Sequence, residues 1–454
     1  MEKKVFLNYI DTIILPLFTG SKIIGEEEST PRDSEVALGL GGTLLIKPTK
    51  NDEYRFILKR DMPFKANDVE LIKSIIYELS NVANLGLLLV DNGYLDRLNM
   101  TAVEKAICTS VAELSHETLL GIVTLLDLFA NRTYEGKRIN FGIILNQTQE
   151  SENKTPNMHY SSVFKKDFFA VLSNGIQSCV EFDKEGYYLG HISLERMRFS
   201  PTVCPYDYIS FCRYCDANRI GIVLNSNGEI LIFKDRALVY SKKRGVWNSY
   251  CHDEIIKLFS NRGSQSIKEI RKSIYFTALD VSFNATGSCI AFLNKSFTEQ
   301  ALTHIDIFDI LTEKHFELKK AQIAEYSKRK SKNVTGGIDI ANLTYKEFVE
   351  KYETTKNSCL KATIAGRKFH ELNRKLREEL ASIDGAVIID WDGTIIACGA
   401  IVRIEAGSQA GGRLAATQTL AKYGVAVKIS QDGIMQSYMY DKKDNKVKEI
   451  FSVG

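Results

Sequence analysis

The chain has 454 residues, of which 44% are hydrophobic and 25% are charged, and 59 basic against 56 acidic residues give a formal net charge of +3. This length predicts two or three domains that bury their cores without disulfide or metal staples. Because basic and acidic residues nearly balance, the chain as a whole lacks the large positive charge that would attract nucleic acid or a membrane surface.

Nine cysteines are scattered along the chain, and the apolar stretch near the N-terminus, residues 13–18, is interrupted by Pro16. That stretch is too short for a secretory core, and no other window reaches the roughly 18 apolar residues that a membrane span needs. We therefore expect a cytoplasmic protein with reduced thiols and no membrane partner.

The first part of the chain predicts a mixture of strands and helices. Apolar residues recur at every second position in some segments, which is typical of strands, and at helical spacing in others. A break in the helical pattern is expected near His116. The expected strands are residues 43–47, 56–58 and 141–145, and the expected helices are 68–82, 100–129 and 163–174. Apolar runs joined by an Asp, Asn or Gln turn with Gly predict β-hairpins at 179–191, 222–233, 387–402 and 425–438.

A domain boundary is expected after residue 195. All seven prolines lie at or before Pro205, and Pro201 and Pro205 bracket an irregular stretch. We expect a separate N-terminal α+β domain at 1–195 and an α/β domain at 196–454, with a mixed sheet flanked by helices. The first domain carries no chemical motif.

The second domain begins with a hairpin and a long helix. The pattern predicts a helix at 265–285, a strand at 289–293 and a helix at 366–382. Between them, residues 296–360 read as an insertion, partly helical and partly flexible, with a lysine cluster that includes Lys319. We interpret this cluster as a solvated face rather than a nucleic-acid surface.

The chemistry is concentrated between Asp384 and Asp432. Asp384 stands between a predicted helix and a predicted strand, which suits a metal ligand at a strand edge. Gly411 and Gly412 open the next helix, where unpaired N–H groups and the helix dipole favour a phosphate, and Arg413 adds a charged donor fork. The same residues also suit an ordinary tight turn and a helix cap, so the local pattern leaves both interpretations open.

The order of these motifs resembles the diadenylate cyclase family. Asp384-Gly385-Ala386 matches the family's Asp-Gly-Ala motif, and Ala415-Ala416 matches the end of its Arg-His-Arg-Ala-Ala motif. The helix at 267–285 and the strand at 289–293 resemble the family's first helix and strand, and the hairpin at 222–240 would extend that sheet.

The resemblance implies an enzyme that joins two ATP molecules into the second messenger cyclic di-AMP, or a related cyclic dinucleotide. It implies Mg²⁺ or Mn²⁺ held by Asp384, a homo-oligomer with active sites face to face, and regulation by the N-terminal domain as a sensor. It places catalysis on Asp384 and Arg413, and nucleotide binding on Gly385, Ala386, Ser408, Gly411, Gly412 and Arg413.

The chain departs from the family at the phosphate-binding motif. Gly412-Arg413-Leu414 stands where the family has Arg-His-Arg, and Ser430-Gln431-Asp432 replaces an acidic pair. Loss of two cations weakens charge neutralisation in a transition state. The sequence therefore keeps two further hypotheses open, a catalytically inactive nucleotide receptor and an interaction protein with no ligand.

Other candidate residues favour structural roles. Cys212 and Cys215, with Cys204 before them and Cys251-His252 after them, have part of the spacing of a zinc site, but we interpret them as buried thiols. Trp391 and Trp247 are interpreted as packing aromatics rather than base-stacking platforms.

Overall fold

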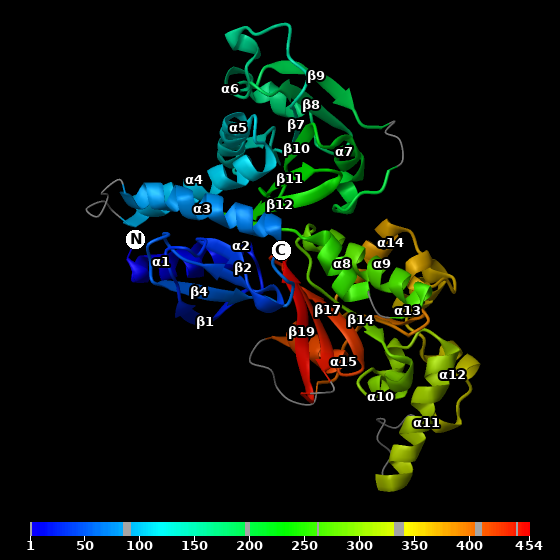
Figure 1. The fold of residues 1–454 in the computed structure, drawn as a ribbon. Coiled ribbons are helices and arrows are strands. Elements are labelled where there is room, and N and C mark those ends of the chain that lie inside the picture. The colour runs from blue at the N-terminus through cyan, green and yellow to red at the C-terminus, as the bar shows by residue number, and fades with distance from the viewer. Residues whose placement is uncertain are drawn as a thin grey trace. The chain divides into compact units, whose positions relative to one another are not determined.

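The computed structural model describes residues 2–84, 92–195, 200–260, 263–330, 340–404, 411–441 and 444–454. The chain folds into two compact units. The first comprises Met1–His252 with Val453–Gly454, and the second comprises Asp253–Ser452. Each unit contains β-sheet flanked by helices (Figure 1), which confirms the expected α/β class with mixed sheets.

The first unit holds a four-stranded and a seven-stranded sheet. The smaller sheet is antiparallel, in the order β1-β4-β3-β2, and the larger has the order β13-β12-β11-β10-β7-β8-β9 with β7 and β8 parallel. The strands of these two sheets are β1 (Lys22–Glu28), β2 (Val36–Leu38), β3 (Leu44–Ile46), β4 (Tyr54–Lys59), β7 (Phe141–Asn146), β8 (Ser178–Asp183), β9 (Tyr188–Ser193), β10 (Arg219–Leu224), β11 (Ile230–Lys234), β12 (Ala237–Lys243) and β13 (Val246–Ser249). A separate two-stranded sheet pairs β5 (Thr133–Tyr134) with β6 (Lys137–Arg138).

Helices cover these sheets, and α3 and α4 lie side by side (Figure 1). The helices are α1 (Lys3–Tyr9), α3 (Ala66–Asn84), α4 (Asn92–Val111), α5 (His116–Phe129), α6 (Tyr160–Val163) and α7 (Ile209–Tyr214). The expected break near His116 is the start of α5. Apolar residues of α1, α3, α4 and α5 and of strands in both sheets share one hydrophobic core.

The second unit is built around one six-stranded sheet in the order β16-β15-β14-β17-β18-β19, with β14 and β15 parallel. The strands are β14 (Ser288–Leu293), β15 (Ala386–Ile389), β16 (Ile395–Ala400), β17 (Gly424–Ile429), β18 (Met435–Asp441) and β19 (Lys446–Val453). The helices are α8 (His252–Ser260), α9 (Gln265–Ser282), α10 (Thr298–Leu302), α11 (Glu313–Lys330), α12 (Tyr345–Tyr352), α13 (Thr355–Ile364), α14 (Arg374–Ala381) and α15 (Gly412–Ala421).

Helices pack on both faces of this sheet. The Thr417 hydroxyl of α15 donates to Cys289 Sγ, whereas Arg271 of α9 lies over the Phe292 ring. Residues 289 and 292 point to opposite faces because side chains alternate along a strand. The helix α9 also packs against α14, where Arg374 makes two hydrogen bonds, at 2.8 and 2.7 Å, to the buried Asp280 carboxylate.

The boundary between the units falls later than the expected position after residue 195. The strand β10 pairs with β7 from Arg219↔Asn146 to Leu224↔Phe141, so residues 219–249 complete the sheet of the first unit. The hairpin at 222–240 therefore does not extend the second unit's sheet, because long-range strand pairing decides which sheet a hairpin joins.

Two expected helices are shorter than their periodicity suggests. Residues 163–174 form only the end of α6 and a single turn, and the Asn174 side chain accepts the backbone N–H groups of Ile176 and Gln177. Residues 366–382 hold a 3-10 turn at Phe369–Glu371 and then α14, which begins only at Arg374 because the side chain of Asn373 accepts the Leu376 N–H and caps the helix there. In both places local side-chain bonds to the backbone compete with the helix.

The insertion at 296–360 belongs to the core of the second unit in its described parts. Leu302, Phe316 and Phe348 are buried together with residues of β14 and β15. Lys319 is only 6% exposed, and its ammonium donates to the Leu302 carbonyl oxygen at 2.6 Å, so the solvated-face interpretation is wrong for this residue. The Gly336-Gly337 pair lies outside the described residues.

Among the residues that the structure describes, no helix combines the length and the apolar character that crossing a bilayer would need.

Candidate functional site

The register of the six-stranded sheet gathers the predicted site residues at one edge. Cys289 pairs with Ala386, and Ser288 pairs with Ile429. The residues just before β14 and β15 and just after β17 therefore lie level with one another. Gly287 directly precedes β14 and Ser430 directly follows β17, whereas Asp384 lies two residues before β15, where the extended register places it opposite Gly287.

Asp384 and Arg413 meet at this edge. Arg413 Nη2 lies 3.9 Å from Asp384 Oδ1, and the two side chains are 41% and 93% exposed. The structure thus brings together the acid before β15 and the cation at the start of α15. The pair is too long for a hydrogen bond and well solvated, so it leaves both groups available to a ligand.

Gly287 makes room for Arg413, and the sequence analysis did not single it out. Gly287 is buried, and a Cβ there would lie 2.5 Å from Arg413 Cζ and 3.0 Å from its Nε. The guanidinium therefore rests on a backbone position that has no side chain. The signal available in the sequence was a glycine two residues before the expected strand at 289–293.

The turn before β15 requires its glycine. Gly385 has φ +111°, and a Cβ there would lie 2.5 Å from the carbonyl carbon of Gly399 and 2.8 Å from the nitrogen of Ala400. Only glycine adopts that backbone without strain while β16 approaches so closely. Ala386 is 1% exposed and pairs with Ala400, so its side chain belongs to the core.

The start of α15 presents open backbone. Gly411 is the N-cap residue, with φ +89° and no side chain to satisfy the first N–H groups of the helix. Among the described residues, which resume at Gly411, a Cβ at Gly411 or Gly412 would meet no atom within 4 Å. A phosphate can therefore approach these N–H groups, which lie at the positive end of the helix dipole. Ser408 lies outside the described residues.

A divalent cation fits Asp384 only together with a ligand. In the described part of the chain, no three His, Cys, Asp or Glu side chains gather closely enough to hold a metal ion. Mg²⁺ in nucleotide sites commonly takes one or two carboxylates and completes its shell with phosphate oxygens and water. The exposed Asp384 carboxylate suits that arrangement. Asp432, bonded by the Ser430 hydroxyl, stands in the turn after β17 as a second acid at this edge.

A buried polar cluster at the opposite end of β15 also escaped the sequence analysis. Asp390 is fully buried, and its carboxylate accepts hydrogen bonds from Thr298 Oγ1 at 2.8 Å, Lys314 Nζ at 3.1 Å and the Trp391 N–H at 2.9 Å. His315 Nε2 lies 3.0 Å from the same carboxylate. Burial raises the pKa of Asp390, but these hydrogen bonds outweigh it and hold the pKa well below its usual range.

The cysteine group considered for zinc consists largely of buried side chains. Cys204, Cys212 and Cys215 are fully buried, and none of the nine cysteines, all of which the structure describes, forms a disulfide. Burial raises the pKa of Cys215 well above its usual value, and the neighbouring Cys179 adds to the shift. A thiol held neutral in this way is a poor metal ligand.

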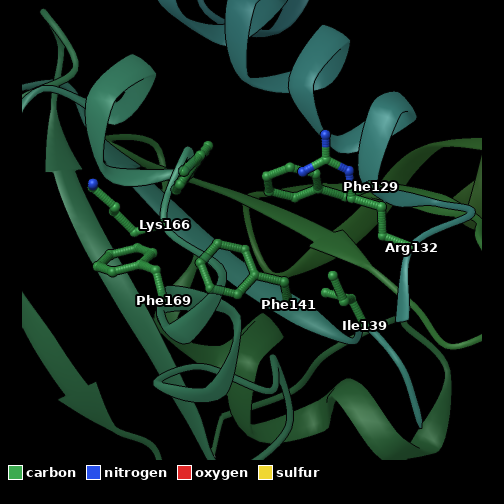
Figure 2. Close-up of a pocket in the computed structure, with 7 residues that line it drawn as sticks. Phe129, Arg132, Ile139, Phe141, Lys166 and Phe169 are labelled. Carbon is green, nitrogen blue, oxygen red and sulfur yellow. The ribbon is translucent and has the colours of Figure 1, made fainter. Parts of the chain in front are cut away.

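The first unit was expected to act as a sensor, and Figure 2 shows an aromatic pocket in it. Phe129, Phe141 and Phe169 come from α5, β7 and the turn after α6, with Lys166 at the rim and Arg132 Cζ 5.0 Å from the centre of the Phe129 ring. The space inside is about 10 Å³, which is room for about one water molecule. This pocket is a narrow gap between the packed aromatic side chains of the core.

Comparisons with known proteins give limited information. No protein-family model matches the chain, and no curated protein matches it. Among solved structures, the chain is similar to a double mutant of DacA from Staphylococcus aureus, with 11% sequence identity, covering 41% of this chain and 90% of that chain. The TM-score is 0.23, so this likeness carries no argument about function.

Proposed function

We propose that the second unit binds a nucleoside triphosphate with Mg²⁺ or Mn²⁺ at the edge formed by Asp384, Gly411, Gly412 and Arg413. The observation that carries this proposal is the approach of Arg413 to within 3.9 Å of Asp384, beside an open helix start. A cation-binding carboxylate and an anion-binding helix start in one place match the two needs of a metal-bound triphosphate.

The residues of this site have separate roles in binding the phosphates and the cation. The first N–H groups of α15 and the Arg413 guanidinium hold phosphate oxygens. Asp384 holds the cation, which when bound neutralises phosphate charge and lowers the pKa of a coordinated hydroxyl. Gly385 keeps the turn tight enough that Asp384 reaches the solvent at the strand edge.

We further propose that two copies face each other and join two ATP molecules into cyclic di-AMP or a related cyclic dinucleotide. Each transfer forms one bond from a ribose 3′-oxygen to an α-phosphorus, breaks one α–β phosphoanhydride bond, and releases pyrophosphate and a proton. Asp384 is 93% exposed, and electrostatic catalysis is strongest where water is excluded. A second copy covering this edge would supply that exclusion.

A receptor without turnover is the second candidate. Gly412 and Leu414 flank Arg413 where diadenylate cyclases carry cations. Fewer cations reduce stabilisation of a pentavalent phosphorus more than they reduce ground-state binding, so affinity can survive the loss of catalysis.

One experiment separates the candidates. The purified full-length chain is incubated with ATP, GTP, CTP or UTP and Mn²⁺, and the products are resolved by mass spectrometry. A cyclic dinucleotide that disappears in Asp384→Asn supports the enzyme. Nucleotide-dependent thermal stabilisation without product supports the receptor.

Two glycine variants sharpen this test. Gly412→Ala places a methyl group in open space without backbone strain, so loss of nucleotide binding reports a blocked ligand rather than a damaged fold. Gly190→Ala is the matched control, because a Cβ there also meets nothing within 4 Å. If neither product nor stabilisation appears with any of the four nucleotides, the proposal is wrong.

The first unit would regulate this site. A truncation that tests for inhibition should begin at Asp253, because a cut after residue 195 would separate β10 from its partner β7. Higher cyclase activity or nucleotide affinity in the truncated chain supports regulation, provided that circular dichroism shows a folded second unit. Equal activity in the two chains contradicts it.

A further inference from the structure

A large cavity lies at the other edge of the second unit's sheet. Its volume is about 930 Å³, and it opens where β14 ends and β17 begins. Leu293 pairs with Gly424 at this edge, whereas Ser288 pairs with Ile429 at the Asp384 edge. Five residues of strand separate the two edges by roughly 17 Å. Neither Asp384 nor Arg413 lines the cavity.

We propose that this cavity binds a free nucleotide, independently of the Asp384 site. The ligand class follows from two features of the walls, an aromatic platform and a surplus of cationic side chains. The volume lies within the range of about 300–1,000 Å³ that holds compounds of this size.

The platform is Trp391. Its side chain is partly exposed, it lines the cavity, and the Lys295 ammonium lies 4.8 Å from the ring centre. An indole with one face on a cation presents a flat surface for stacking a base. Phe297 and Tyr440 line the same cavity and add apolar surface for a ring.

The buried Asp390 cluster holds this platform in place. The Trp391 N–H donates to Asp390 Oδ1, which also accepts the Thr298 hydroxyl. Thr298 follows the segment that carries Lys295 and Phe297, so one buried carboxylate fixes both sides of the Lys295–Trp391 pair. Asn294 N–H donates to the Tyr423 carbonyl at 2.9 Å and clamps the rim. The site is therefore ordered before a ligand arrives, which lowers the entropic cost of binding.

The charges around the cavity favour an anion. Arg271, Lys295, Lys422 and Lys448 line it, together with Asp441 and Glu449. Lys448 pairs with Asp441 at 2.7 Å and also with Asp444, which does not line the cavity. Glu449 accepts the Gln436 amide at 3.2 Å. Four cationic side chains against two acidic ones give this lining a net positive charge, which suits a phosphate group.

Calorimetric titration of the full chain with ADP in the presence of EDTA tests this site. Chelation removes the cation on which the Asp384 site depends, so binding that persists reports the cavity. We expect one ADP per chain for the native protein and for Asp384→Asn. Trp391→Ala and Lys422→Gln should each weaken binding about tenfold or more, and Trp391→Phe should retain most of the affinity.

One control variant and three contrary outcomes test this cavity as the nucleotide site. Lys268→Gln, an exposed lysine on α9 that does not line the cavity, should bind ADP like the native chain. Equal thermal unfolding of Trp391→Ala, Trp391→Phe and the native chain shows that the platform variants fold. Absence of ADP binding up to millimolar concentration overturns the proposal. So does inorganic tripolyphosphate binding as tightly as ADP, because the ring would then contribute nothing. Binding that is lost in Asp384→Asn but kept in Trp391→Ala assigns the nucleotide to the other edge, which removes this proposal and supports the proposed function.

Discussion

Gly287 and Arg413 are packed so closely that the guanidinium occupies the space that a side chain on Gly287 would fill. A Cβ at residue 287 would lie 2.5 Å from Arg413 Cζ. This contact steers Arg413 along the start of β14 and toward Asp384, 3.9 Å away. The geometry of the candidate site thus depends on a residue without a side chain.

Gly287→Ala should therefore weaken nucleotide binding without unfolding the chain. The backbone of Gly287 is compatible with alanine, and the clash is with the far end of one flexible side chain. Displacing Arg413 removes a charge-assisted hydrogen bond worth about 1.5–3 kcal/mol, or roughly tenfold or more in Kd. Calorimetry with ATP and Mn²⁺ measures this. Gly190→Ala serves as control, and unchanged affinity in Gly287→Ala would show that Arg413 does not contact the phosphates.

Asp390→Asn should destabilise the second unit at neutral pH by about 3–5 kcal/mol, because it leaves the buried donors of the cluster without their anion. The pKa of Asp390 is depressed in the folded chain, so its contribution is fully present above the unfolded value of about 3.9 and is lost as pH falls through the folded pKa. The stability gap between native and variant chains should therefore shrink below about pH 4.

Urea unfolding at pH 7, 5 and 3 measures this gap. Asp444→Asn, which removes a partly exposed partner of Lys448, should cost less than about 1 kcal/mol. A gap that stays constant down to pH 3 would mean that Asp390 is not charged in the folded protein.

Lys319 should make stability rise with pH in the alkaline range. Burial lowers the pKa of Lys319 to about 8, and the positive charge of Arg403 acts in the same direction while Asp306 opposes it. The unfolded chain keeps this proton until about pH 10.4, so between the two values the unfolded state binds more protons and folding gains stability. Relative to Lys319→Met, the native chain should gain roughly 1–3 kcal/mol from pH 7 to 9.5. Urea titrations measure the gain, and Lys346→Met, on an exposed lysine, should follow the native chain.

One thiol should react fast with Ellman's reagent at pH 8. Cys359 is exposed, Cys251 is partly buried and the other cysteines are buried. Burial also raises the pKa of Cys289 to about 11, which keeps it in the unreactive thiol form. Cys359→Ser should remove the fast phase. An EDTA-dependent rise in reactive thiols would instead indicate a zinc ion on Cys204, Cys212 and Cys215.

Local chemistry in the sequence was enough to predict most elements and to select Asp384, Gly411, Gly412 and Arg413 as candidate site residues. Apolar periodicity predicted the helix that became α9, and turns of Asp or Asn with Gly predicted the hairpins. These signals are local, because turn residues and side-chain spacing act within a few positions. The same locality explains the two overlong helices, where Asn174 and Asn373 bond to nearby backbone.

Only the tertiary structure decided which distant segments meet. Strand pairing assigned residues 219–249 to the first unit's sheet, and packing buried Lys319. Three-dimensional proximity alone joined Gly287 to Arg413 and Asp390 to Thr298. Such contacts depend on the free energy of burying surfaces far apart in the chain, which no local window of sequence records. The sequence therefore indicates which residues carry suitable chemistry, whereas folding determines which distant residues each of them contacts.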